Sequence, residues 1–278
     1  MFIIVSKIKF AFLSIFLGIL LLGASTAARA DTMAYFEGSG EFGTIDLNNG
    51  AISIINSNNG LAGAAGLGVF NGTLYAATNN GGINGQLYSI NPATGVATFI
   101  ASSGVAYSTF GSTSSGLFAY VTGGSLASIN PSTGAATTVG SPEGALFPAF
   151  STSSDSSSLY EFNASNQLTD HNLESIDTTN GNVSVLGSNL GGVQSMLEVG
   201  GTLYAIYLPS APGSAWGLYT LNGSGATEIY SPESAVYFNG LAPDPLTSRP
   251  VPEPFTFLLV GSGLIPFIRL RKKRSIAA

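Results

Sequence analysis

The chain has 278 residues, of which only 9% are charged, and its formal net charge is −6 at pH 7. All nine Lys and Arg residues lie within the first thirty or the last thirty residues, so residues 31–248 hold no permanent cation. Fourteen of the fifteen carboxylates lie between Asp31 and Asp244. Because binding to nucleic acids requires Lys and Arg to neutralise phosphates, this composition excludes nucleic acid as a partner.

The chain contains no cysteine. Disulfides, cysteine nucleophiles and thiolate metal sites are therefore excluded, and the fold must be stabilised by a buried core. The 36 glycines, together with Ser, Thr and Asn between short apolar runs, are typical of an all-β protein with many turns.

The first segment, residues 1–30, has the three parts of a secretory signal peptide. Two lysines precede the apolar run Phe10–Leu22, and the segment ends with Ala28 and Ala30 in an A-x-A cleavage pattern. We expect signal peptidase to cleave there after export, so that the mature chain begins at Asp31.

Five segments of the middle region then repeat one pattern: a strand, an Asx-containing turn, a glycine and a second strand. The marker glycines, spaced by 45, 39, 47 and 44 residues, are Gly50, Gly95, Gly134, Gly181 and Gly225. This period suits a four-stranded blade of a β-propeller. An Asn such as Asn91 can bond the backbone ahead of it, and the glycine provides the left-handed residue that closes the turn.

Each marker hairpin follows two further apolar runs, which gives four strands in each repeat. The earlier runs are Ala62–Val69, Val105–Phe110, Leu146–Phe150 and Val193–Val199. The first repeat lacks this strand, while Ala235–Leu241 is left over at the end. We expect that run to complete the first blade, which predicts a five-bladed β-propeller of four-stranded blades at residues 31–246. A six-bladed propeller and a β-sandwich are the alternative folds.

In a propeller the first strand of each blade lines the axis. The predicted axial runs, such as Val193–Leu197 and Val236–Gly240, contain no Asp or Glu, and Glu143, Glu198 and Glu233 are expected nearer the rims. Glycoside hydrolysis requires paired carboxylates, so the sequence predicts no catalytic residues. A glycan-hydrolysing propeller remains the least unlikely enzymatic alternative.

The only histidine, His171, is expected in a solvated loop at Asn163–Asn172. No Gly-x-Ser-x-Gly motif accompanies it, and one histidine cannot form a His-based zinc site. We therefore predict neither a metal site nor a cofactor.

Aromatic side chains are candidates for a lectin-like contact with glycans, because stacking on sugars requires no cation. Tyr107, Tyr207 and Tyr237 are available, although most tyrosines are expected in the core. Trp216 lies among glycines and a proline and is the best loop aromatic for glycan contact.

The last segment, residues 247–278, has three parts. Pro252, Glu253 and Pro254 precede an uncharged run, Phe255–Ile268, that predicts a short hydrophobic helix. Fourteen helical residues reach about 21 Å, short of a bilayer core of about 30 Å. The basic residues behind the run, expected to hold this end in the cytoplasm, are Arg269, Arg271, Lys272, Lys273 and Arg274.

This tail resembles the PEP-CTERM sorting signal. The resemblance covers about thirty residues and implies processing at the Pro-Glu-Pro triplet by an exosortase, a membrane protease of bacteria that make exopolysaccharide. It also implies export in a Gram-negative-type bacterium, transient membrane anchoring by the C-terminal helix, and a final place at the cell surface or in the extracellular matrix. Together with the propeller, it predicts a structural or adhesive protein associated with exopolysaccharide.

Overall fold

The computed structural model describes residues 33–245, except 39, 62, 81–83, 122, 141–148, 154–156, 167–169, 209–215, 223–224 and 232–237. The regular elements of this part are all strands, which confirms the all-β prediction. Among these residues no helix is long and apolar enough to cross a membrane. The signal peptide, the sorting tail and its expected hydrophobic helix lie outside the described residues.

The twenty described strands pair as five antiparallel arrays of four, which we call blades 1 to 5. Blade 1 consists of β20 (Gly240–Pro243), β1 (Met33–Gly38), β2 (Glu41–Asp46) and β3 (Ile52–Asn56). Blade 2 consists of β4 (Ala64–Phe70), β5 (Thr73–Asn80), β6 (Asn84–Ile90) and β7 (Ala97–Ser102). Blade 3 consists of β8 (Tyr107–Thr113), β9 (Gly116–Val121), β10 (Ser125–Ile129) and β11 (Ala136–Gly140).

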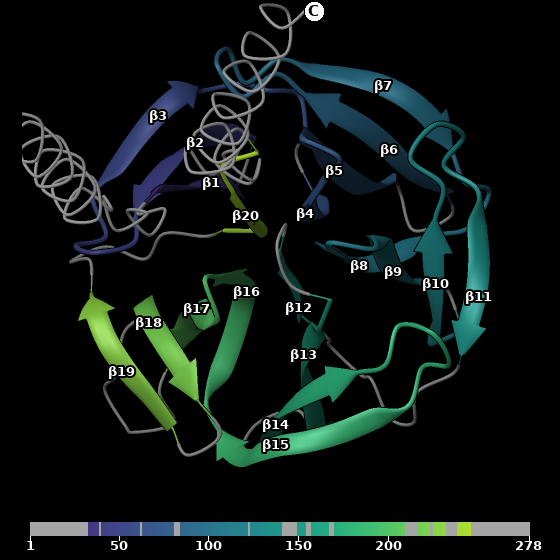
Figure 1. The fold of residues 1–278 in the computed structure, drawn as a ribbon. Helices are drawn as coiled ribbons and strands as arrows, with labels where there is room; N and C mark the ends of the chain where they lie inside the picture. Colours follow the sequence, from purple (N-terminus) through teal and green to yellow (C-terminus); the bar gives the residue numbers. More distant parts are fainter. Residues whose placement is uncertain are drawn as a thin grey trace, which may run out of the picture.

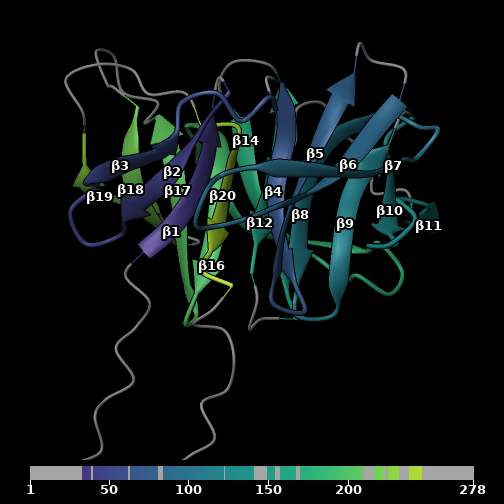
Figure 2. The ribbon, with the colours of Figure 1, turned by 90° about the horizontal axis from the view of Figure 1, so that it is seen from above.

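Blade 4 consists of β12 (Ala149–Thr152), β13 (Leu159–Asn166), β14 (Asp170–Ile176) and β15 (Val183–Leu190), and blade 5 of β16 (Gly192–Val199), β17 (Thr202–Leu208), β18 (Gly217–Asn222) and β19 (Gly225–Tyr230). The blades form a ring in which the first-named strand of each lies near the centre and the last at the rim (Figure 1). The inner strand β12 also pairs in parallel with β8 and β16 of the neighbouring blades. Seen from the edge, the inner strands β20, β4 and β12 run side by side through the ring (Figure 2).

The two ends of the described chain meet in blade 1. β20 pairs antiparallel with β1, with Phe36 opposite Leu241 and Glu37 opposite Gly240. The prediction that a late strand completes the first blade is confirmed, although the strand begins at Gly240 rather than at Ala235. This pairing closes the ring and covers the inner edge of β1.

The marker turns have the predicted chemistry in four blades. Gly50, Gly95, Gly134 and Gly181 have φ between 64° and 77°. Each of these glycines donates its N–H to the carbonyl four residues earlier, and the side chain of that earlier Asp or Asn accepts a backbone N–H two residues ahead of it. Gly225 differs, because it has a φ of 156° and is already the first residue of β19.

These turns also join neighbouring blades. A Cβ added to Gly95 of blade 2 would lie 2.6 Å from the Cβ of Asn56 in blade 1, and one added to Gly134 of blade 3 would lie 3.2 Å from the Cβ of Ala101 in blade 2. Glycine is therefore required at these two positions for two reasons: the backbone is left-handed, and the neighbouring blade approaches too closely for a side chain.

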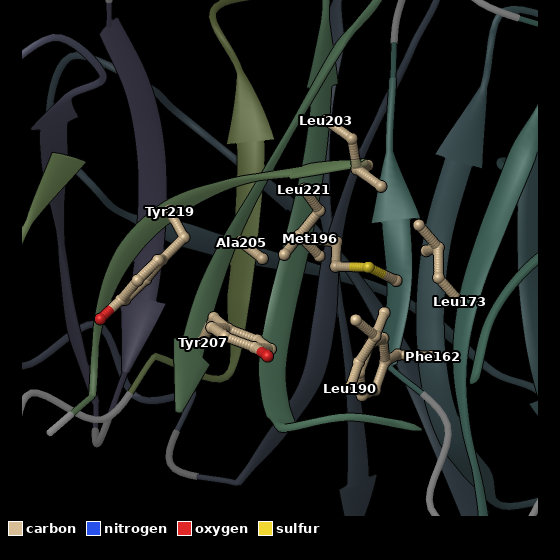
Figure 3. Packing of buried hydrophobic residues seen from close by; sticks show 9 residues of the cluster. All are labelled: Phe162, Leu173, Leu190, Met196, Leu203, Ala205, Tyr207, Tyr219 and Leu221. Carbon is tan, nitrogen blue, oxygen red and sulfur yellow. The ribbon is translucent and has the colours of Figure 1, made fainter. Parts of the chain in front are cut away.

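Apolar side chains fill the spaces between blades. The cluster between blades 4 and 5, drawn in Figure 3, consists of Phe162, Leu173, Leu190, Met196, Leu203, Ala205, Tyr207, Tyr219 and Leu221. Four further clusters occupy the other spaces around the ring. The core is thus distributed around the ring, and the inner strands meet at the axis without a single central core.

Candidate functional site

A cavity of about 230 Å³ lies where the five inner strands converge. Its walls come from β4, β8, β12, β16 and β20 with the residues directly before it, and they include Gly66, Thr109, Thr152, Ser195 and Asn239. The volume is below the roughly 300–1,000 Å³ of ordinary ligand pockets, so it suits one small unit of a larger molecule.

The polar groups of the wall are hydroxyls and amides. Ser195 is buried, and its Oγ has no hydrogen-bond partner among the described residues. The Oε1 atom of Gln194 accepts the backbone N–H of Phe238 at 3.3 Å, which leaves the amide nitrogen of Gln194 as a donor. Asn239 is half-buried and presents a second amide to the cavity.

The apolar part of the wall includes three phenylalanines whose positions are fixed by other rings. Phe150 packs against Tyr120 with ring centroids 4.8 Å apart, and Phe238 meets Phe36 edge-on at 4.7 Å. Phe110 is buried in the core between blades 2 and 3. Aromatic surface beside hydroxyl and amide groups is suited to binding an uncharged, polyhydroxylated ligand.

The described lining residues include no Asp, Glu, Lys, Arg or His. A carboxyl does lie one strand behind the wall, because Glu37 on β1 is fully buried beside β20. Burial raises the pKa of Glu37 to about 7, while hydrogen bonding by the Gly40 N–H and the Asn239 side chain opposes the rise. The described wall of the cavity is thus uncharged, and Glu37 is a titratable group that lies behind it.

A second buried carboxyl lies between blades 3 and 4. The hydroxyl of Tyr120 donates to Oε2 of Glu161 at 2.7 Å, and Glu174 lies opposite Glu161 in the register of β13 and β14. Burial raises the pKa of Glu161, the Tyr120 hydrogen bond opposes this, and Glu174 raises the pKa further. Glu161 is fully buried within the junction, so no substrate reaches it.

The axial runs predicted from the sequence require one correction. Glu198 was expected outside the inner strand and near a rim, but β16 extends to Val199, and Glu198 is a buried residue of that strand. Glu198 is not among the residues that line the cavity. Glu143 and Glu233 lie outside the described residues.

The prediction of a solvated loop for His171 is wrong. His171 is half-buried in β14, and its ring stacks on that of Phe162 with centroids 5.5 Å apart. The polar stretch contains the ends of two paired strands, β13 and β14, in which Asn163 pairs with Asn172 and Ala164 with His171. Within the described ranges, no group of three His, Cys, Asp or Glu residues is arranged to hold a metal ion.

Trp216 lies outside the strands, as predicted, and its contact with glycan stays a prediction. It precedes β18, is half-buried, and packs against the core cluster between blades 5 and 1. Tyr107 and Tyr207 are buried and donate to or accept from backbone groups at Gly134 and Gly191, so they belong to the core. Tyr237 lies outside the described residues, as do Ala28, Ala30, the Pro252–Pro254 triplet and the basic cluster Arg269–Arg274.

Gln194, Ser195 and Asn239 lie in runs that the sequence correctly predicted at the axis, yet nothing singled them out as a site. The available signal was a polar residue within an otherwise apolar inner strand. Such residues are informative only once the other inner strands are known to face them.

No protein-family model matches the chain, and no curated protein matches it in sequence. Among solved structures, it resembles a chain of a nidogen–laminin complex with a TM-score of 0.53 and 12% identity, over 76% of this chain and 97% of that one. A Bacteroides thetaiotaomicron protein of unknown function matches at a TM-score of 0.45 and 15% identity, over 79% of this chain and 63% of that one. A calcium-binding regucalcin from Agrobacterium tumefaciens matches at a TM-score of 0.40 and 16% identity, over 72% of this chain and 70% of that one. At these identities the likeness concerns the fold alone, and the chain is a β-propeller.

Proposed function

We propose that this chain is an exported, non-catalytic β-propeller that binds an uncharged sugar unit of exopolysaccharide in its axial cavity. The observation that supports this most is the composition of the cavity wall: hydroxyls, amides and phenyl rings from β8, β12, β16 and the residues directly before β20, with no charged side chain among the described lining residues. The buried, unpartnered Oγ of Ser195 offers a hydrogen bond that a ligand hydroxyl can complete.

A binding role also agrees with the position of the buried carboxyls. Glycoside hydrolysis requires two carboxyls about 5–10 Å apart on either side of an accessible substrate. Glu161 and Glu174 are closed within a junction, and Glu37 lies behind the wall. Release of reducing sugar from a neutral polysaccharide by the purified protein would contradict the non-catalytic proposal.

The cavity is tested by filling it. In a Ser195→Leu variant the longer side chain should occupy the cavity and lower the binding of neutral oligosaccharides on a glycan array by tenfold or more. Ser53→Leu is the matched control, because Ser53 is exposed on the rim strand β3. Ser195→Ala removes the hydroxyl without adding volume and should weaken binding by about 2–10-fold, the worth of one hydrogen bond. Equal binding by Ser195→Leu and Ser53→Leu would rule out the axial cavity as the site.

We further propose that the protein reaches the cell surface by the PEP-CTERM route. Its support is the order of the Pro252–Pro254 triplet, an uncharged run and a terminal basic cluster, in a chain that begins with a signal-peptide pattern. Replacing Glu253 with Ala should leave the unprocessed precursor in the membrane. Mass spectrometry of the mature C-terminus measures this directly, and unchanged processing would contradict an exosortase route.

A further inference from the structure

The two ends of the axial cavity differ, because its lining comes from one end of the inner strands. The strand β12 is parallel to β8 and to β16. The strands β4, β8, β16 and β20 all line the cavity with residues from the first half of the strand. The cavity therefore lies toward the face of the ring where the inner strands begin, which we call the start face. The opposite face, where these strands end, is the end face.

The exposure of the lining residues decreases along the inner strands. On β8, Ser108 is exposed whereas the next residue, Thr109, is buried. On β16, Gln194 is half-buried whereas Ser195 is buried. Solvent therefore reaches the cavity wall from the start face, and the mouth of the cavity lies there.

Toward the end face, hydrogen bonds between inner strands close the axis. The hydroxyl of Thr152 on β12 donates to the carbonyl of Leu67 on β4, which joins two blades that are not neighbours in the ring. The hydroxyl of Ser112 on β8 accepts the N–H of Val69 at 2.8 Å and donates to the carbonyl of Ser153 at 3.2 Å. The three hydroxyl residues that take part are at most 1% exposed. The described residues thus leave the cavity without an exit on its end-face side.

Both ends of the propeller chain lie on the end face. In the pairing of β20 with β1, Pro243 lies opposite Ala34, so β1 begins where β20 ends (Figure 2). A Cβ added to Gly72, in the turn that follows β4, would lie 3.9 Å from the carbonyl oxygen of Pro245. Because an inner strand ends at that turn, Pro245 lies on the end face. A tether that follows Pro245 therefore leaves the ring on the face opposite the mouth.

We propose that the axial cavity is a blind pocket for a sugar unit that has a single glycosidic bond, and that its mouth faces away from the tether. An internal unit of a linear polysaccharide has two glycosidic bonds, so its chain must leave the pocket in two directions. The closed side offers no second exit, whereas a chain end or a one-sugar side branch requires only the mouth. This inference rests on the proposed function and deepens it, because it names the part of the polysaccharide that binds.

The closure is tested first without a ligand, by the reactivity of single thiols in a chain that has no other cysteine. Ser108→Cys, at the mouth, should react with methyl methanethiosulfonate. Ser112→Cys, four residues further along β8, should react more slowly by roughly tenfold or more, because its thiol is reached only when the closed axis opens. Equal rates in the two folded variants, as checked by circular dichroism, would overturn the proposal. The two tests that follow keep Ser112, so they apply even if Ser112→Cys does not fold.

The position of the mouth is tested by blocking one face at a time. Ser57 and Ser114 are both exposed, but Ser57 lies in the loop before β4 on the start face and Ser114 in the turn after β8 on the end face. Streptavidin held by a biotin maleimide on Ser57→Cys should lower the binding of neutral array oligosaccharides by about tenfold or more. On the matched control Ser114→Cys it should change binding by less than about twofold. Equal or stronger blocking at position 114, or no blocking at either position, would overturn a mouth on the start face.

The linkage of the bound sugar is tested with neutral array glycans that carry the same sugar at a chain end, as a one-sugar branch or only inside a chain. Binding should be stronger by about tenfold or more for the end or the branch than for the internal unit. Exoglycosidase removal of the end or of the branch shows which of these two sources is bound. Equal binding of internal units would overturn the inference and leave the proposed function intact. Failure of every neutral glycan to bind would refute the proposed function, and with it the sugar ligand, whatever the thiol reactivities show.

Discussion

At one equivalent position of the second strands, two of the five blade junctions place a fully buried carboxyl where the other three place only apolar side chains. On the second strand of each blade, one equivalent position faces the next blade: Glu37, Ala77, Tyr120, Phe162 and Ile206. Their partners on the next blade, given in the same order, are Ala76, Ala119, Glu161, Ala205 and Phe36. The pairs Ala77–Ala119, Phe162–Ala205 and Ile206–Phe36 each belong to one apolar cluster.

The difference shows how a domain without Lys or Arg tolerates a buried acid. An ion pair is not available, so the charged form must be stabilised by hydrogen bonds or the carboxyl must keep its proton. Glu161 receives the Tyr120 hydroxyl, whereas Glu37 receives the backbone N–H of Gly40 on Oε1 and has no hydrogen-bond partner on Oε2 among the described residues. In both cases burial dominates, and the pKa is raised. The apolar pairs at this position have no titratable side chain and add no such dependence on pH.

The largest expected effect is a loss of stability as the pH rises. The Glu37 pKa is about 7 in the folded state against 4.5 unfolded, so the folded state binds more protons between these values. Its contribution is fully present below pH 4.5 and is lost as the pH rises through 7. The free energy of unfolding should therefore be about 2–3 kcal/mol lower at pH 8 than at pH 5 from Glu37 alone.

Urea unfolding of the wild type and of Glu37→Gln at the two pH values measures this contribution. The variant should show a smaller difference between pH 5 and pH 8, because it has no proton to lose at position 37. A wild-type protein that is more stable at pH 8 would contradict the assignment of raised pKa values to both junctions.

An intermediate effect is expected when the junction of blades 3 and 4 is altered. Tyr120→Phe removes the hydroxyl that donates to Oε2 of Glu161 and should lower the free energy of unfolding by about 1–3 kcal/mol, more at pH 8 than at pH 5. The double change Tyr120→Phe with Glu161→Ala recreates the Phe162–Ala205 pair of the next junction. It should be less destabilising than the sum of the two single changes, as a double-mutant cycle by urea unfolding would measure. Strict additivity would show that the two side chains are not coupled.

The smallest effect is expected at the apolar junction of blades 2 and 3. Gly134→Ala places a side chain on a left-handed backbone, with φ of 64°, and 3.2 Å from the Cβ of Ala101, and should destabilise the fold by about 1–2 kcal/mol. Gly104→Ala, with φ of 76° and no atom within 4 Å, is the control for the backbone alone. Thermal unfolding should show the larger loss for Gly134→Ala and no dependence on pH in either variant. If the loss of stability in Gly134→Ala depended on pH, the junctions with a buried carboxyl would no longer be distinguished from the apolar ones by their pH dependence.

Much of the fold was predictable because its signals are local. Asn91 and Gly95 specify a turn within five residues, and the spacing of such turns predicts four-stranded blades. The closing strand was also predictable, because one blade lacked a strand at its start and one run was left over at the end. His171 was misplaced for a similarly local reason, since a polar stretch resembles a loop when the pairing of Ala164 with His171 is not known.

The sequence by itself determined the class of fold, the rhythm of its turns and the absence of cations between residues 31 and 248, because each depends on residue types and their spacing. Only the tertiary structure decided which polar side chains meet at the axis and which carboxyls are buried. Ser195 and Asn239 are 44 positions apart in the sequence, and both line the cavity because ring closure brings β16 and β20 together at its centre. Glu37 and Glu161 are ordinary strand residues in the sequence, and the burial of each of them within the folded ring is what raises its pKa.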